Sequence, residues 1–244
     1  MHRAGMKKTH FVSIILIAFF LLDMTNESTA QRQDVDWSVG FDAGLLLFYG
    51  DIKEKDFIPV LRNRNEVKLG GGINVKRRLN PYLSLQFHMI WGKLSGTNRT
   101  LEQYFISDIF NWNVNANISI NEIVFYPENK GDLQVYLMLG AGLVDFRSKL
   151  FDLNNNEIVD VIGYSHDGKS KEKMTTELVI PLGFGASYGM HNLYTEENVF
   201  FDKVDIVFEF RWYFTNTDKI DMSNAVRSGK DQYSFASIGL HYNF

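Results

Sequence analysis

Residues 112–121 read WNVNANISIN, and this alternation decides the fold. In an extended chain, successive side chains point to opposite sides, so one side of this stretch is apolar and the other carries asparagine and serine. The apolar side chains are Trp112, Val114, Ala116, Ile118 and Ile120. An α-helix would instead bring apolar residues together at intervals of three and four. The stretch therefore predicts a β-strand with one apolar and one polar face.

The same alternation recurs along the chain and predicts eight strands. The expected strands are 37–49, 67–75, 83–91, 112–121, 133–145, 176–188, 203–214 and 232–244. The connections alternate in length, since 50–65, 95–108, 147–175 and 215–231 are long and polar, whereas RRLNP and PENKGD are tight turns. This rhythm predicts an up-and-down meander whose large loops lie at one end. The segment from Gly189 to Lys203 is longer than this scheme expects.

The first residues have the pattern of a secretory signal peptide. A basic stretch, MHRAGMKKTH, precedes the apolar run FVSIILIAFFLL, and small residues, STA, stand before Gln31. We therefore expect residues 1–30 to be a cleaved signal peptide and residues 31–244 to form one barrel domain. The chain has 0 cysteines, so no disulfide framework is expected.

The polar face of the strands decides between two kinds of barrel. A secreted ligand-binding barrel would turn its apolar stripe inward around a cavity. Here the other stripe is rich in glycine and asparagine and carries the charges Asp42, Lys68, Lys76, Asp205, Glu209 and Arg211. Such a stripe suits a narrow lumen, with the apolar stripe facing lipid. We predict an all-β protein, an eight-stranded antiparallel up-and-down transmembrane β-barrel, in which Pro181 must leave a bulge or a missing ladder bond.

The last residues, YSFASIGLHYNF, predict the location of the barrel. Ser237, Gly239, Tyr242 and Phe244 match the pattern that the outer-membrane assembly machinery recognises in the last strand of its clients. We therefore expect this machinery as a partner and the cell outer membrane as the location, with lipid around the barrel. The formal net charge of -4, without a basic block, argues against nucleic acid as a partner.

A lumen of eight strands is just wide enough for side chains, so a diffusion channel is not expected. Glu209 and Arg211 lie two residues apart on one strand face and are expected to form an ion pair, with a proton or ion path as the alternative. Asp42 with Lys68 or Lys76 is a second candidate pair.

Catalysis is not expected, because the histidines do not fall together in the predicted barrel. His88 is predicted to face inward in mid-strand and His241 to lie near the periplasmic end, so we expect them not to share a site. His166 lies in a charged loop. With no nucleophile beside a histidine, we predict no enzyme, no cofactor and no metal site.

Two segments carry a resemblance to a known family. GFDAGLLLFYGDI (40–52) and FEFRWYFTNTDKIDMSNAV (208–226) resemble the opening and penultimate strands of small outer-membrane barrels from Bacteroidota, a group that includes the PorG-type component of the type IX secretion system. The family positions are Tyr49, Gly50, Asp51, Arg211, Asp218, Asp221 and Ser223. Lys219 and Met222 stand where the family has tyrosine and a second aspartate. The resemblance implies no catalytic role for these residues.

Two classes of function remain open. The resemblance implies a non-enzymatic accessory or structural component of a type IX-like secretion or gliding machinery, with periplasmic ring proteins as possible partners. The alternative is a free-standing structural or adhesive barrel that acts through its surface loops. A lipid-modifying outer-membrane enzyme is a distant third.

Overall fold

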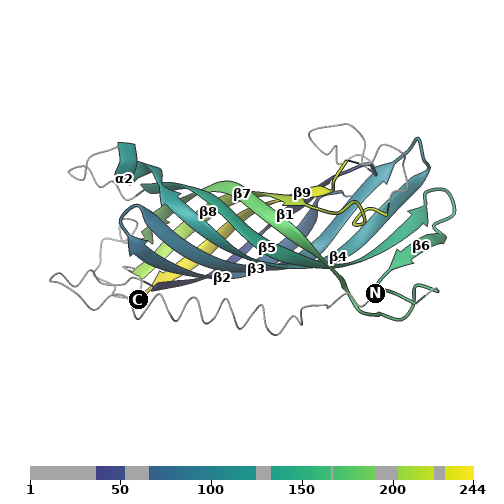
Figure 1. Cartoon of the computed structure of the whole chain (residues 1–244), viewed down its shortest axis with the longest axis horizontal. Coiled ribbons are helices and arrows are strands. Elements are labelled where there is room, and N and C mark those ends of the chain that lie inside the picture. Colours follow the sequence, from purple (N-terminus) through teal and green to yellow (C-terminus); the bar gives the residue numbers. More distant parts are fainter. Residues whose placement is uncertain (1–36, 53–65, 125–132, 166, 191–202, 223–228) are drawn as a thin grey trace, which may run out of the picture. The chain divides into compact units, whose positions relative to one another are not determined.

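A computed structural model describes residues 37–52, 66–124, 133–165, 167–190, 203–222 and 229–244. These residues form a closed antiparallel barrel of eight strands, with a ninth strand outside the barrel wall (Figure 1). The strands are β1 (Trp37–Tyr49), β2 (Lys68–Asn80), β3 (Leu83–Asn98), β4 (Gln103–Ser119), β5 (Leu133–Asp152), β6 (Ile158–Ile162), β7 (Thr175–Gly189), β8 (Val204–Thr215) and β9 (Gln232–Asn243). A short helix, α2 (Ile120–Val124), follows β4.

The barrel closes where β1 pairs with β9. Their register runs from Ser38 opposite Asn243 to Tyr49 opposite Gln232. Next to the Ser38–Asn243 pair, Trp37 and Phe244 exchange two backbone hydrogen bonds, of 3.2 and 2.9 Å. Every other neighbouring pair of wall strands is sequential, apart from β5 and β7, between which β6 is inserted. The predicted eight-stranded up-and-down barrel is confirmed.

Three turns use the same device, in which a side-chain oxygen holds the following backbone. Asn80 Oδ1 accepts hydrogen bonds from the amides of Tyr82 and Leu83, both at 2.9 Å. Asn98 Oδ1 accepts equivalent bonds between β3 and β4, and Asp152 Oδ1 does so after β5. Asparagine and aspartate favour turns for this reason. The tight turn predicted for RRLNP is thereby explained.

Two predicted long loops contain strand residues. The segment 95–108 consists of the ends of β3 and β4 joined by a short turn, and part of 147–175 belongs to β5 and β6. Both predictions were wrong because polar residues interrupt the alternation there. Beyond Phe146, where β7 stops covering β5, the residues Ser148 to Phe151 of β5 pair with β6 instead. The exposed edge of a strand that projects beyond the barrel is thus covered.

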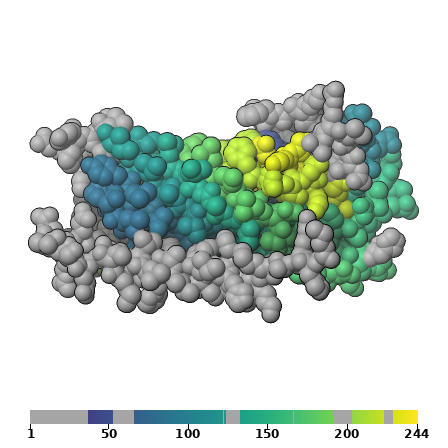
Figure 2. Space-filling model, viewed as in Figure 1, coloured from purple at the N-terminus to yellow at the C-terminus, as the bar shows by residue number. Residues whose placement is uncertain are grey.

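The outer face of the barrel is an apolar surface. Large hydrophobic side chains from all wall strands are exposed there, among them Phe41, Leu69, Trp91, Phe110, Leu137, Leu182, Phe208 and Leu240. Figure 2 shows the side chains of the wall strands closely packed over one face of the barrel. A soluble protein does not expose so much apolar area, whereas a barrel in lipid requires it. The protein is an outer-membrane β-barrel. Its one described helix, α2, is too short to cross a bilayer.

The inner face differs from the prediction in one half. Towards the end that carries Trp37 and Phe244 it is polar, as expected, but towards the opposite end it is apolar. Leu46, Phe48, Ile90 and Phe235 all face inward there and are almost fully buried. The sequence interpretation missed this change because these residues lie at the ends of stripes that begin with polar residues. The lumen is therefore built of two layers, one polar and one apolar.

Pro181 interrupts the ladder, as predicted. The pairing of β5 with β7 is lost between Leu139–Leu182 and Gly142–Val179, and it resumes in the same register. On its other side, Pro181 stays paired with Tyr213 of β8. The ladder therefore has a gap but no bulge. Proline has no backbone N–H to donate, and no extra residue is inserted in either strand.

Several predictions fall outside the described residues. They concern the signal peptide 1–30, most of the loop 50–65, the turn PENKGD, His166, Ser223 and most of the segment from Gly189 to Lys203.

The lipid-facing surface can be tested at Phe184, which is 56% exposed on β7. We expect Phe184→Arg to lower the free energy of unfolding by about 2–4 kcal/mol, because an arginine near the bilayer midplane is costly. The measurement is denaturant unfolding in lipid vesicles, with the apolar Phe184→Leu as the control. Equal stability of the arginine and leucine variants would contradict a lipid-facing position.

Candidate functional site: the filled lumen and its cap

The polar layer is centred on Glu209. Its Oε2 accepts a hydrogen bond from Nη2 of Arg211, and both side chains are buried. Its Oε1 accepts bonds from Tyr136 Oη at 2.6 Å and from Gln86 Nε2 at 3.3 Å. Glu209 lies on β8, Tyr136 on β5 and Gln86 on β3, and none of these strands are neighbours in the wall. The bonds therefore cross the lumen and fill it.

A second group of polar side chains continues this layer. His88 Nε2 lies 3.0 Å from Asp42 Oδ2, and Asn74 Nδ2 donates to the same oxygen at 3.1 Å. Asn74 Nδ2 also lies 3.1 Å from His241 Nε2. The expectation that His88 and His241 do not share a site was wrong, because Asp42 contacts His88 and Asn74 links Asp42 to His241. Both histidines belong to one buried network.

Glycines on the inner face make room for this network. A Cβ at Gly72 would lie 2.4 Å from Asp42 Oδ1 and 2.6 Å from His88 Nε2. A Cβ at Gly185 would lie 2.5 Å from Cζ of Tyr136. Such distances are too short for any side chain, so these positions explain the glycine content of the predicted polar stripe.

The asparagines of β4 form a ladder along the inner wall. Asn115 Nδ2 donates to Asn113 Oδ1 at 2.6 Å, and Asn113 Nδ2 donates to Asn111 Oδ1 at 2.5 Å. Asn111 Nδ2 in turn donates to Tyr233 Oη at 2.7 Å. The stretch WNVNANISIN thus supplies both the lipid-facing side chains and part of the polar filling.

The predicted lumen charges fall into two groups. Asp42, Glu209 and Arg211 are buried in the network, whereas Lys68, Lys76 and Asp205 are only partly buried. Asp42 contacts His88 and Asn74 rather than either lysine. Nζ of Lys76 lies 5.3 Å from the centre of the Tyr136 ring, and Asp205 accepts a bond from Asn243 at 3.0 Å.

The apolar layer is closed by a segment that follows β8. Ile220 and Met222 of this segment are buried with Phe48, Phe105 and other core side chains from the wall. Ser148 Oγ on β5 donates to the carbonyl oxygen of Ile220 at 2.7 Å and fixes the segment to the wall. Residues 216–222, which we call the cap, therefore seal the mouth of the barrel at the end opposite Trp37 and Phe244.

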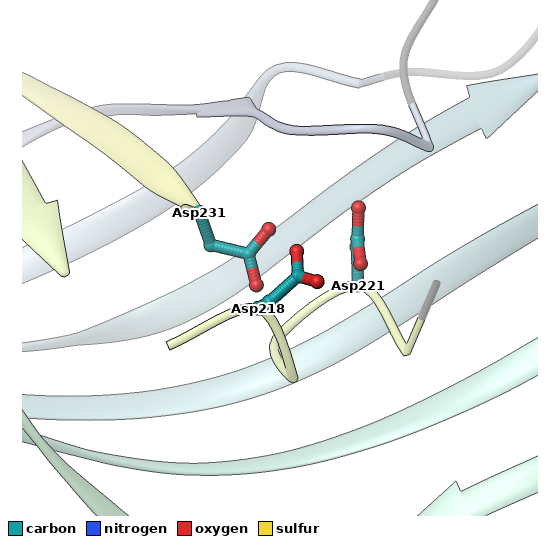
Figure 3. A group of neighbouring side chains, drawn as sticks. All are labelled: Asp218, Asp221 and Asp231. Carbon is teal, nitrogen blue, oxygen red and sulfur yellow. The ribbon is translucent and has the colours of Figure 1, made fainter. Parts of the chain in front are cut away.

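Three aspartates gather at the cap (Figure 3). One carboxylate oxygen from each of Asp218, Asp221 and Asp231 lies within 4.8 Å of the others. Ile52 N donates to Asp221 Oδ2 at 3.0 Å, and Ile220 N donates to Asp231 Oδ2 at 2.8 Å. Burial and the charge of Asp221 raise the pKa of Asp231 to about 8. Burial and the charge of Asp218 raise the pKa of Asp51. We call Asp218, Asp221 and Asp231 the aspartate cluster.

Four of the seven family positions named from the sequence meet at this cluster, two lie elsewhere, and Ser223 is outside the described residues. Asp218 and Asp221 belong to the cluster, and Gly50 and Asp51 lie beside it. Tyr49 stacks on Trp212 at 4.4 Å between ring centres, and Arg211 lies in the polar layer. Sequence reasoning missed Asp231. A usable signal was present, because Asp231 directly precedes the last strand, Asp51 follows the first strand, and these two strands must pair to close a barrel.

The residues of the terminal pattern divide between the two faces of β9. Ser237 is buried on the inner side, where a Cβ at Gly239 would lie 2.9 Å from Cβ of Asp42. Tyr242 and Phe244 are exposed on the outer side, with ring centres 6.3 Å apart. This is the placement expected for a last strand that faces lipid.

The lumen network has acid–base groups but little access. A histidine beside an aspartate is the arrangement that orients a general base. However, His88 is 0% exposed and Asp42 is 8% exposed. A substrate could reach this pair only if the filling moved. The arrangement is suited to holding the wall strands together.

Comparison with known proteins adds similar structures but no family. No protein-family model matches the chain, and no curated protein matches it. Similar solved structures include Neisserial surface protein A, with 14% identity, a TM-score of 0.48, and 85% of this chain and 97% of that chain covered. Another is Ail, the attachment invasion locus protein of Yersinia pestis, with 10% identity, a TM-score of 0.46, and 87% and 100% covered. A major outer membrane protein from Thermus thermophilus has 12% identity, a TM-score of 0.44, and 85% and 99% covered.

The contribution of the ion pair can be tested with a double-mutant cycle. Glu209→Leu removes the nearest counter-charge of a buried arginine and should cost about 3–5 kcal/mol of unfolding free energy. Adding Arg211→Met should recover much of this loss, because replacing a whole buried pair by apolar residues is often nearly neutral. Denaturant unfolding of the single and double variants measures the coupling. Losses that simply add would show that the two charges act independently.

Proposed function

We propose that this protein is a non-enzymatic structural and surface-binding barrel of the outer membrane. The observation that carries this proposal is the filled lumen. Polar side chains from non-neighbouring strands meet across it, and the cap residues Ile220 and Met222 are buried at its mouth. A barrel filled in this way offers solutes no open path. We therefore expect the protein to act through its exposed surfaces.

The strands that project beyond the membrane supply the binding surface. A transmembrane β-strand needs about 9–11 residues. β4 has 17 residues and β5 has 20, and β6 extends their sheet at the end opposite the C-terminal Phe244 (Figure 1). On β6, Ile158 and Val159 are 39% and 51% exposed. We infer that this extension, formed by the ends of β4 and β5 together with β6, contacts a partner outside the cell.

An accessory role in a type IX-like secretion or gliding machinery is the second candidate. One observation favours it: Gly50, Asp51, Asp218 and Asp221, from the two segments that carry the family resemblance, lie together at one end of the barrel. Its periplasmic ring partners would bind at the opposite end. A lipid-modifying enzyme is less favoured, because the His88–Asp42 pair is buried.

Depletion of the protein in its native cell separates the two candidates. For the surface-binding function, we expect attachment of the cells to surfaces to fall while secreted proteins stay at normal levels. Re-expression of a variant in which residues 153–174 are replaced by a short turn should insert normally but fail to restore attachment. Re-expression of the full chain is the control. Accumulation of cargo in the periplasm of depleted cells would contradict this function and support the secretion role.

A further inference from the structure

The aspartate cluster concentrates acidic groups where the described residues provide few counter-charges. Asp221 and Asp231 are each 0% exposed. Taking carboxylates out of water is costly unless an opposite charge or hydrogen bonds compensate. Lys219 and Lys230, which adjoin the cluster residues in sequence, contact other side chains instead. Nζ of Lys219 lies 3.8 Å from Oε1 of Glu177, and Nζ of Lys230 lies 2.5 Å from Oδ1 of Asn216.

A second observation points to a ligand between the carboxylates. Oδ1 of the fully buried Asp231 has no hydrogen-bond partner among the described residues, and the same holds for the buried Oδ1 of Asp218 and Oδ2 of Asp51. In Figure 3 the carboxylate of Asp231 faces that of Asp218. A buried acceptor without a partner in a native protein calls for an unseen donor or ion.

The chain passes close to this oxygen at a glycine. A Cβ at Gly50 would lie 2.4 Å from Cζ of Phe48 and 2.7 Å from Oδ1 of Asp231. No side chain at position 50 therefore covers the oxygen that lacks a partner. Backbone amides of Ile52 and Ile220 hold the other oxygens of Asp221 and Asp231, which orients the two carboxylates.

We propose that Asp218, Asp221 and Asp231 bind one Ca²⁺ ion, which fastens the cap to the mouth of the barrel. Carboxylate oxygens are the ligands that hard divalent cations take. The three oxygens lie within 4.8 Å of one another. Ca²⁺ accepts oxygens at about 2.3–2.6 Å in a flexible geometry, whereas Mg²⁺ demands a near-ideal octahedron at about 2.0–2.1 Å, so carboxylates from separate segments suit Ca²⁺ better. Water would complete the shell, because Ca²⁺ takes about 6–8 oxygens.

The place of the cluster in the fold gives this ion a structural task. Asp218 and Asp221 belong to the cap, whereas Asp231 directly precedes β9 and Ile52, the donor to Asp221, follows β1. One ion would therefore join the cap to the strands at which the barrel closes. The long-loop end of an outer-membrane barrel faces the outside, where Ca²⁺ sites of about 10⁻⁴–10⁻³ M affinity are in use.

The test uses the full mature chain refolded in detergent and freed of metal with a chelator. Calorimetric titration with CaCl₂ should show one ion bound per chain. Millimolar Ca²⁺ should raise the unfolding midpoint by about 5 °C over chelator. Asp231→Asn keeps the shape of the side chain and an oxygen but removes a charge, so it should weaken Ca²⁺ binding at least about tenfold.

A matched control is available on β6. Asp160 is exposed and its Oδ1 accepts a bond from the amide of Val161, so Asp160→Asn should bind Ca²⁺ as the unchanged chain does. Failure of the folded, unchanged chain to bind Ca²⁺ would overturn the proposal, and a proton shared by the carboxylates would then replace the ion. Equal binding by Asp231→Asn, or tighter binding of Mg²⁺ than of Ca²⁺, would also overturn it.

Discussion

The rest of the structure depends on the closed hydrogen-bond ladder. Hydrocarbon offers no partner to a free backbone amide or carbonyl, so a sheet in the membrane must have no open edge. β1 and β9, the first and last strands, provide this closure along their full length, and Trp37 and Phe244 extend it by one more pair. The gap at Pro181 shows how local a defect can stay when the register on both sides is fixed.

Closure at eight strands leaves an interior that side chains must fill. The filling is divided into a polar layer around Glu209 and an apolar layer under the cap. Each large inward side chain needs a small residue next to it on the inner face. For this reason glycine lies beside Asp42 and opposite Tyr136. The same principle accounts for Gly50 beside the aspartate cluster. Small residues on the inner face are therefore as much part of the fold as the apolar residues on the outer face.

The alternation in the sequence was sufficient to predict the number of wall strands, their order and the face that meets lipid, but it did not reveal β6. It could not predict the strand ends, because polar residues of β4 and β5 remain paired beyond the membrane. It also could not show that Asp42 and Asn74 together link His88 to His241, since register and side-chain reach decide such contacts. The sequence predicted only part of the aspartate cluster. Asp51, Asp218 and Asp221 were named from a resemblance, whereas Asp231 needed the closed barrel to bring it close.

The central claim is that this barrel is closed by its own side chains and acts through its surfaces. The most direct test is the electrical conductance of a planar lipid bilayer into which the purified full-length mature chain has been inserted. We predict no discrete conductance steps, with insertion verified by protease protection of the wall strands. Regular steps that persist at constant voltage would contradict the account, because they would require an open path through the polar and apolar layers.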